Sequence, residues 1–167
     1  MLRRGTALRY FLDTEYNGWG GALLSLALVP EDGGEEFYVT LDWSGSVEPW
    51  VGQNVIPYLD MVPEPLISPR LSPEDAASEL SAWLVREQGA HLARNGSNFF
   101  EIVADWPEDI SQFCSLLIVG PGLTVEVPPL TFRLIQLPGF SPAANSKVPH
   151  NALHDARALR DHVLEVE

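Results

Sequence analysis

Residues 9–15 read Arg-Tyr-Phe-Leu-Asp-Thr-Glu, an apolar run that stops at two acidic residues. This pattern predicts a short strand with an acidic end. Turn-forming residues follow at 17–21 (Asn-Gly-Trp-Gly-Gly), and the apolar run 22–29 predicts a second strand. A hairpin signal at 31–34 (Glu-Asp-Gly-Gly) precedes a third strand at 36–41. Three consecutive strands joined by short turns predict an antiparallel meander.

Beyond the meander, predicted helices and strands alternate. The proline-rich segment 44–72 predicts a long irregular connection, of a kind that is more often functional or partner-binding than idle. Ser72, Pro73 and the acids after them predict the start of a helix that runs to about Gln88. The other elements are expected as a strand at 98–104, a helix at 110–119, a strand at 130–137 and a helix at 152–166. This order predicts one α/β domain over residues 1–167, a mixed sheet flanked by helices, and resembles the ribonuclease H-like fold.

The composition is that of a globular protein, with 46% hydrophobic and 20% charged residues. The apolar run 22–29 is too short to cross a bilayer. Residues 1–4 (Met-Leu-Arg-Arg) could open a signal peptide, but Asp13 and Glu15 arrive before an adequate apolar region. We therefore expect a cytoplasmic protein without a membrane partner. The single cysteine, Cys114, excludes an internal disulfide and is expected to be a buried small hydrophobe.

Two segments in the first two thirds of the chain concentrate acidic residues. Asp13 and Glu15 are two apart on a predicted strand, so both side chains point to one face. Like charges placed this way repel unless a cation lies between them. The pair therefore indicates either a cation site or a solvated strand end. The segment 103–109 (Val-Ala-Asp-Trp-Pro-Glu-Asp) joins a predicted strand to the next helix. Asp109 opens that helix, where an acid can also complement the helix dipole or act as an N-cap.

A third segment near the C-terminus, residues 150–156, reads His-Asn-Ala-Leu-His-Asp-Ala. On one continuous helix, His150 and Asp155 would lie about 140° apart around the axis and roughly 7.5 Å apart along it. They can converge only if His150 precedes the regular helix, and Pro149 favours this because it disfavours a helical conformation for Val148. The remaining histidines are expected elsewhere: His154 on another side of the helix, His91 and His162 on the surface.

Together these segments resemble the DEDDh family of 3′–5′ exonucleases, which includes oligoribonuclease and RNase T. The resemblance rests on Phe-Leu-Asp-Thr-Glu at 11–15, on an acid at the start of a central helix, and on residues 150–156. The last of these matches the family pattern His-x-Ala-x-x-Asp-Ala. The short chain and Ala-Asp-Trp-Pro at 104–107 are similar to the small bacterial and phage exoribonuclease-like group.

The resemblance implies a metal centre with a histidine general base. By this resemblance, three metal ligands of the family correspond to Asp13, Glu15 and Asp155, and its general base corresponds to His150. The remaining ligand is either Asp105 or Asp109. Asp109 fits better, because the family places this acid at a helix start with an aromatic residue a turn later, here Phe113. The resemblance also implies a homodimer, for which the apolar segment 47–71 offers contacts.

The chemistry expected of such a site uses two divalent cations roughly 3.5–4 Å apart. Carboxylate oxygens suit Mg²⁺ or Mn²⁺, with His150 taking the proton of the attacking water and a nucleoside 5′-monophosphate leaving. Thr14, within the first motif, and Trp19, just past it, are expected to contact the substrate. Trp19 would either stack on the terminal base or pack against its turn. The other tryptophans are expected in the core or a dimer interface (Trp43, Trp50, Trp83) or beside Asp109 (Trp106).

The formal charge of −13 limits the substrates to be considered. With 10 Lys and Arg against 23 Asp and Glu, the chain is a poor binder of long nucleic acids regardless of their sequence. The charge suits a substrate held over its last few nucleotides, so we expect 3′ ends of RNA or short oligonucleotides as partners. Two alternatives stay open. One is a DNA exonuclease of the same family, since discrimination depends on contacts to the 2′-hydroxyl, and the other is an inactive ribonuclease H-like binding module.

Overall fold

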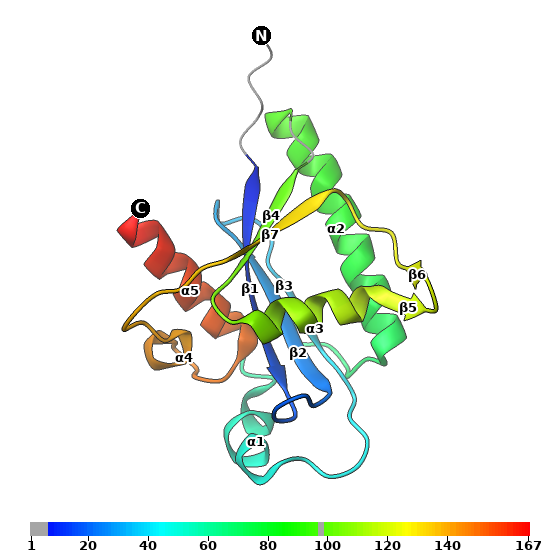
Figure 1. The fold of residues 1–167 in the computed structure, drawn as a ribbon, viewed down its shortest axis with the longest axis vertical. Helices are drawn as coiled ribbons and strands as arrows, with labels where there is room; N and C mark the ends of the chain where they lie inside the picture. The colour runs from blue at the N-terminus through cyan, green and yellow to red at the C-terminus, as the bar shows by residue number, and fades with distance from the viewer. Residues whose placement is uncertain (1–6, 97–98) are drawn as a thin grey trace.

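The computed structural model describes residues 7–96 and 99–167 and shows an α/β protein with a five-stranded mixed sheet (Figure 1). Residues 1–4, considered above as the start of a signal peptide, and Asn98, expected to open a strand, lie outside the described residues. Within the described part of the chain, no helix is long and apolar enough to cross a membrane.

The strands of the sheet lie in the order β3-β2-β1-β4-β7. β2 pairs antiparallel with β1 and with β3, which confirms the predicted meander. The β1–β4 and β4–β7 pairs are parallel, and parallel neighbours need long crossover connections, which contain the helices. The bounds are Leu8–Tyr16 for β1, Leu23–Pro30 for β2, Phe37–Thr40 for β3, Phe100–Ala104 for β4 and Leu130–Leu134 for β7.

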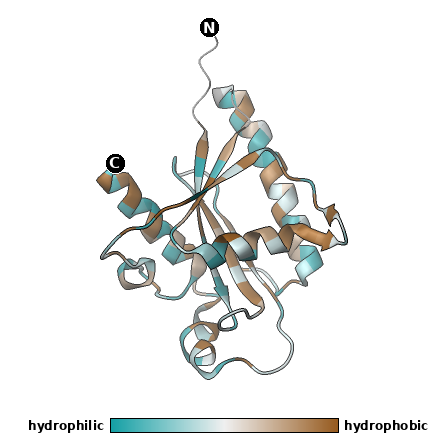
Figure 2. Cartoon of the chain, viewed as in Figure 1, coloured by the Kyte–Doolittle hydropathy of each residue, from teal (hydrophilic) through white to brown (hydrophobic). Residues whose placement is uncertain are grey.

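Three long helices cover the two faces of the sheet. α2 (Pro73–Asn95) and α3 (Pro107–Leu117) pack on one face, and α5 (Ala152–Val166) packs on the other. Successive residues of β1 alternate between these faces: Leu12 joins the core beneath α2 and α3, whereas Phe11 packs under α5. Each helix carries both hydrophobic and hydrophilic residues (Figure 2), as expected of helices with one buried side.

The segment expected to be irregular contains short helical elements. These are α1 (Pro49–Asn54) and two 3₁₀ turns, η1 (Ile56–Tyr58) and η2 (Glu64–Leu66). A proline occupies the first turn of each, where it removes no helical hydrogen bond. The prolines therefore start short helices here as well as interrupting longer ones. The segment is fixed to β2 by a buried apolar cluster that contains Leu24, Val51, Val55 and Leu59.

α2 is longer than predicted. It continues past Gln88 to Asn95 and ends where Gly96 adopts a left-handed φ of 67°. The extra turns bury His91 beside Phe100 of β4, with the ring centroids 6.1 Å apart. The prediction that His91 lies on the surface was therefore wrong, because it rested on too short a helix.

α3 is displaced from its predicted range of 110–119. It begins at Pro107, and Ile118–Gly120 form strand β5, which pairs with β6 (Leu123–Thr124). The apolar residues at this junction fit a helix or a strand equally well, and the glycines that follow them favour the hairpin. Strand β7 likewise ends at Leu134 rather than at residue 137.

Candidate functional site

The end of β1 turns its acidic side chains toward α5. Phe11 packs with Leu159 of α5, so the Phe11 side chain lies on the face of the sheet that α5 covers. Because side chains alternate along a strand, Asp13 and Glu15 lie on the same face as Phe11, and Thr14 lies on the opposite face. Asp13 is buried and Glu15 is partly exposed. Both carboxylates therefore lie near the start of α5.

The first turn of α3 brings a third carboxylate to this strand end. Pro107 opens the helix, and the amide of Asp109 donates a hydrogen bond to the carbonyl of Trp106 (3.2 Å). The Asp109 side chain is buried, and its Oδ1 accepts from the Thr14 amide (3.2 Å) and the Thr14 hydroxyl (2.6 Å). Thr14 was expected to contact the substrate. In this structure its two donors bind Asp109, and the substrate contact stays a prediction.

The start of α5 supplies the fourth carboxylate and the histidine. Asn151 caps the helix, because its Oδ1 accepts hydrogen bonds from the amides of Leu153 (3.1 Å) and His154 (3.3 Å). His150 lies just before the cap with a φ of 61°, a left-handed conformation that is uncommon for a residue other than glycine. Its amide donates to Asp155 Oδ2 (3.2 Å). His150 thus precedes the regular helix, as convergence with Asp155 requires.

These segments enclose a cleft of about 420 Å³, called here the acidic cleft. Asp105 also lines it. So do Tyr16 and residues 140–143, which no pattern in the sequence indicated. Trp19 lies outside it. The cleft brings together the other residues predicted for the site: Asp13, Thr14, Glu15, Asp109, His150 and Asp155.

Burial and mutual repulsion make the acidic cleft costly to ionise. Burial raises the pKa of Asp13 well above its usual range, and repulsion from nearby carboxylates, Asp109 foremost, raises it further. Glu15 is affected in the same way, by burial first and then by the charge of Asp155. Burial also raises the pKa of Asp109 to about 7 and that of Asp155 to about 6, although hydrogen bonds to both carboxylates oppose the change.

The residues of the acidic cleft fit a divalent cation. Among the described residues that line the acidic cleft, two buried carboxylate oxygens, Asp13 Oδ2 and Asp155 Oδ1, have no hydrogen-bond partner, an arrangement that costs roughly 1–3 kcal/mol per group. Ligand atoms of Glu15, His150 and Asp155 lie within 4.8 Å of one another. A cation would bind these oxygens and offset the repulsion between the carboxylates. Such oxygen-rich donors are typical of Mg²⁺ and Mn²⁺ sites.

Asp105 and Asp109 both line the acidic cleft but differ in their surroundings. Asp109 is buried and held by Thr14, whereas Asp105 is partly exposed. Repulsion from Asp109 also affects the pKa of Asp13 more than repulsion from Asp105 does. For a cation in the acidic cleft, these contacts favour Asp109 over Asp105 as a ligand.

His150 contacts an aromatic residue that the sequence did not assign to the site. The ring of Trp50, in α1, meets the imidazole edge to face, with centroids 4.8 Å apart and planes at 79°. Partial burial lowers the pKa of His150. Trp50 is 54% exposed, which excludes the core and leaves the expected alternative of a dimer interface, whereas Trp83 is in the core. The contact joins segments far apart in the chain, and no local pattern could have indicated it.

A groove of about 320 Å³ adjoins the acidic cleft, with which it shares Thr14, Glu15, Tyr16 and Trp106. It is called here the aromatic groove. Trp19 lines it and is 97% exposed, which excludes the alternative that this side chain packs against its own turn. Trp106, at 57% exposure, and Trp50 lie along the same groove. Flat apolar surfaces therefore continue outward from the carboxylates.

The other residues considered in the sequence lie outside the acidic cleft. His154 places Nε2 2.8 Å from the carbonyl oxygen of Met61, on another side of α5 as expected. His162, expected on the surface, is partly buried and stacks on Phe140, with centroids 3.9 Å apart. Cys114, expected to be a buried small hydrophobe, packs against the core beneath α2 and α3 but is only partly buried.

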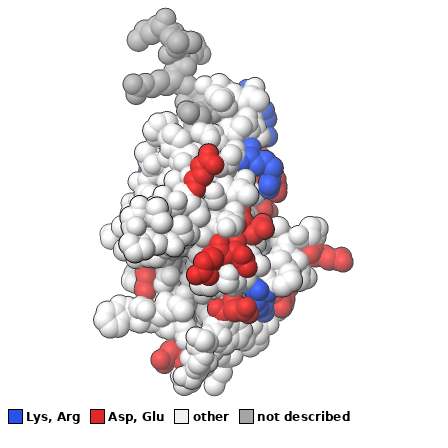
Figure 3. All heavy atoms as spheres, turned by 90° about the vertical axis from the view of Figure 1, so that its right-hand side faces the viewer, with Lys and Arg blue, Asp and Glu red and all other residues white. Residues whose placement is uncertain are grey.

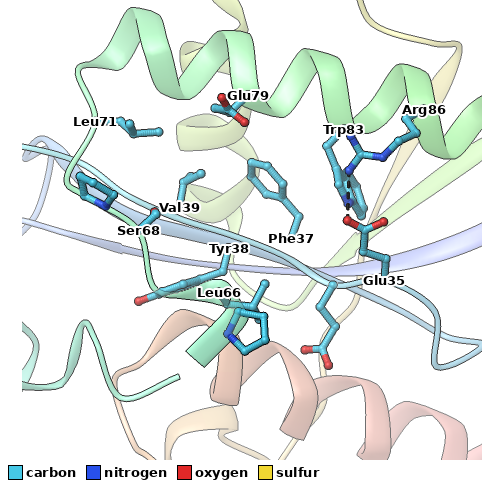
Figure 4. Close-up of a pocket in the computed structure, with 13 residues that line it drawn as sticks. Glu35, Phe37, Tyr38, Val39, Leu66, Ser68, Leu71, Glu79, Trp83 and Arg86 are labelled. Carbon is cyan, nitrogen blue, oxygen red and sulfur yellow. Dashed lines mark hydrogen bonds and ion pairs between the residues drawn. The ribbon is translucent and has the colours of Figure 1, made fainter. Parts of the chain in front are cut away.

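A second cleft, of about 390 Å³, lies beside β3 and α2 (Figure 4). Phe37, Val39 and Trp83 form much of its wall. On its rim, Arg86 pairs with Glu35 at 3.0 Å. Among the described residues, the one close group of metal-ligating side chains lies in the acidic cleft and not here. The two clefts are similar in volume and differ in chemistry.

Acidic side chains also extend beyond the acidic cleft. On the side of the molecule that carries α2, Figure 3 shows more Asp and Glu than Lys and Arg. Such a surface repels the backbone of a long nucleic acid, so a nucleic-acid substrate would have to be bound over a short length.

Comparison of the chain with models of known protein families and with curated proteins gave no match.

Proposed function

We propose that this protein is a metal-dependent 3′–5′ exonuclease that releases nucleoside 5′-monophosphates from RNA or short oligonucleotides. The observation that carries the proposal is the acidic cleft, where carboxylates from β1, α3 and α5 lie beside His150. Their pKa values are raised by burial, so the charged state is costly without a cation. Carboxylates whose pKa values are raised in this way are typical of functional sites.

We propose in addition that the fold is ribonuclease H-like and that the chain belongs with the DEDDh exonucleases. The antiparallel meander followed by two parallel strands supports the fold. The position of His150 before α5 supports the family, because its last motif needs the histidine and Asp155 to converge. The buried acid Asp109, in the first turn of a central helix, supports it as well.

The proposed mechanism assigns a task to each group. The four carboxylates, Asp13, Glu15, Asp109 and Asp155, would hold two ions of Mg²⁺ or Mn²⁺. When bound, the ions would stabilise charge on the attacking and leaving oxygens of the phosphodiester. His150 accepts a proton from the attacking water, and its lowered pKa keeps the imidazole neutral at neutral pH. The bond from the His150 amide to Asp155 ties the base to a carboxylate of the site.

The aromatic groove supplies a place for the terminal bases. Trp19 and Trp106 are exposed beside the carboxylates, and stacking on an aromatic side chain stabilises a bound base by about 1–3 kcal/mol. Every base has a flat face, so this contact carries little sequence preference. We propose that the aromatic groove binds the last nucleotides of a single strand, while the acidic surface discourages contact with a longer polymer.

The direct test is hydrolysis of a short RNA labelled at its 5′ end, in the presence of Mn²⁺. We expect a ladder of labelled products that shorten by one nucleotide at a time, and no products after chelation of the metal. Asp13→Asn and His150→Gln should each lower the rate by at least about 10²-fold while preserving the circular dichroism spectrum. Internal cleavage, or full activity in either variant, would contradict the proposed site.

Two further arms of this experiment address the alternatives. A DNA oligonucleotide of the same sequence distinguishes a ribonuclease from a DNA exonuclease, because only contacts to the 2′-hydroxyl separate the two substrates. The inactive binding module predicts a different pattern. It would bind the RNA with similar affinity with and without Mn²⁺ and would leave it intact at any enzyme concentration.

A further inference from the structure

The imidazole of His150 packs against the ring of Trp50. The backbone of His150 is fixed by the bond from its amide to Asp155 Oδ2, but that bond leaves the side-chain torsions free. Within the described residues, the imidazole itself makes no hydrogen bond, and its contact with the Trp50 ring has an edge-to-face geometry (4.8 Å, 79°). Such aromatic contacts have a preferred orientation and are worth about 0.5–1.5 kcal/mol.

Trp50 is itself carried by an anchored helix. Its neighbours Val51 and Val55 are almost fully buried in the cluster that joins α1 to Leu24 of β2. At the start of α1, the amide of Glu48 donates to Asn17 Oδ1 (2.8 Å), and Asn17 lies in the turn after β1. The helix is thus attached to β2 and to the turn after β1, the strand that carries Asp13 and Glu15. The position of the Trp50 ring is therefore set relative to the carboxylates, although the ring is half exposed.

We propose that Trp50 is a positioning residue that holds the His150 imidazole toward the attacking water in the acidic cleft. This inference rests on the proposed function, in which His150 is the general base. His150 adopts a left-handed backbone conformation at the start of α5, so its side chain leaves the chain in a direction that no regular helix would give it. Trp50 closes that side of the ring and limits the rotation of the imidazole away from Glu15 and Asp155.

A competing role for Trp50 is stacking on a substrate base, since it also lines the aromatic groove. The two roles differ in what they change. Loss of a stacking platform weakens binding and raises KM, whereas a misdirected base lowers kcat. A substrate without a base at its 3′-terminal nucleotide separates them further, because it removes the stacking partner and leaves the phosphodiester in place.

The kinetic test compares Trp50→Phe and Trp50→Ala with the wild type on a normal RNA and on the same RNA with an abasic 3′-terminal nucleotide. We expect Trp50→Ala to lower kcat about 10-fold or more on both RNAs, within the 10²–10⁴-fold contribution of a general base, with KM nearly constant. Trp50→Phe, which keeps a flat ring, should recover most of the loss. Gln53→Ala, an exposed residue of the same helix, is the matched control and should behave as wild type.

A defect that appears on the normal RNA and vanishes on the abasic one would overturn the proposal in favour of base stacking. Unchanged kcat in Trp50→Ala would overturn it as well. Because Trp50 is half exposed, we expect all variants to fold, which circular dichroism and thermal unfolding check.

A second measurement does not depend on activity. In protein labelled with ¹³C and ¹⁵N at histidine, the ring signals of His150 are identified by their loss in His150→Gln. The nearby indole should shift these signals by its ring current, so Trp50→Ala should move them and Gln53→Ala should not. Signals that stay in place would overturn the positioning role. If the wild type hydrolyses no phosphodiester, the proposed function fails, and the ring signals still decide whether Trp50 holds the imidazole.

Discussion

Asp105 and Asp109 compete for one place in the proposed metal centre, and single substitutions can separate them. Asp109 is buried and fixed by Thr14, while Asp105 is partly exposed at the edge of the acidic cleft. We expect Asp109→Asn to lower the rate of RNA hydrolysis by at least about 10²-fold, as loss of a charged ligand should. Asp105→Asn should remain within about threefold of wild type, and each serves as the control for the other. The opposite order would transfer the ligand role to Asp105.

Thr14 should act on the metal through Asp109. Its hydroxyl donates to Asp109 Oδ1 at 2.6 Å, and this bond opposes the rise in the pKa of Asp109. In Thr14→Val the carboxylate loses that donor, so its pKa should rise further and its orientation should loosen. We expect the affinity for Mn²⁺, measured by calorimetry, to fall about 10- to 100-fold. Thr124→Val, on the exposed hairpin, should bind Mn²⁺ as the wild type does.

At the level of elements, the start of α5 depends on one buried asparagine. Asn151 caps the helix through Oδ1, and its Nδ2 donates to the carbonyl of Tyr58 (2.8 Å). We expect Asn151→Ala to lower the free energy of unfolding by about 2 kcal/mol, one part from the lost cap and one from the unsatisfied carbonyl. Asn151→Ser keeps a capping oxygen and should lose about half as much. Denaturant titration measures both, and equal stability of Asn151→Ala and the wild type would show that the cap contributes nothing.

The elements that could be predicted from the sequence are those determined by local chemistry. The meander followed from apolar runs separated by turn residues, and the break before α5 followed from Pro149. Strand alternation placed Asp13 and Glu15 on one face, but their grouping with Asp109, Asp155 and His150 in one site came from the resemblance to the DEDDh exonucleases. By contrast, the sequence predicts a helix for Ile118 and Val119, which form a strand. A short apolar run fits either structure, and the pairing of this run with β6 is a tertiary contact. The contact between Trp50 and His150 was beyond prediction for the same reason.

At the level of the whole molecule, the expected homodimer remains a prediction. The sequence places the expected dimer contacts in segment 47–71, because this segment is apolar. In this structure Val51, Val55 and Leu59 are buried within the chain itself, which leaves fewer apolar side chains for a partner. Light scattering on the purified protein decides the oligomeric state.

The free energy of unfolding should fall as the pH rises, whereas carboxylates with lowered pKa values stabilise a protein more as the pH rises. Unfolded Asp titrates near 3.9, whereas Asp155 and Asp109 titrate at about 6 and about 7 in the folded chain. Between these values the folded protein holds protons that the unfolded chain has released. The stabilisation is complete below the unfolded pKa and is lost as the pH rises through the folded pKa, at up to about 1.4 kcal/mol per pH unit for each group. In a chelator, Tm should therefore fall by several degrees between pH 5 and pH 8.

Metal should reverse this loss, because ions that bind the folded cleft alone stabilise it by about 2.7 kcal/mol at 100 times their dissociation constant. We expect Mn²⁺ to raise Tm strongly at pH 8, where the carboxylates are ionised, and weakly at pH 5, where protons compete for the same oxygens. Asp13→Asn should flatten the pH dependence and remove most of the Mn²⁺ effect. Asp42→Asn, an exposed carboxylate, makes the same change in net charge and should do neither. A Tm that rises from pH 5 to pH 8 in chelator, or an equal Mn²⁺ effect in both variants, would mean that the charges of the cleft do not limit the stability of this protein.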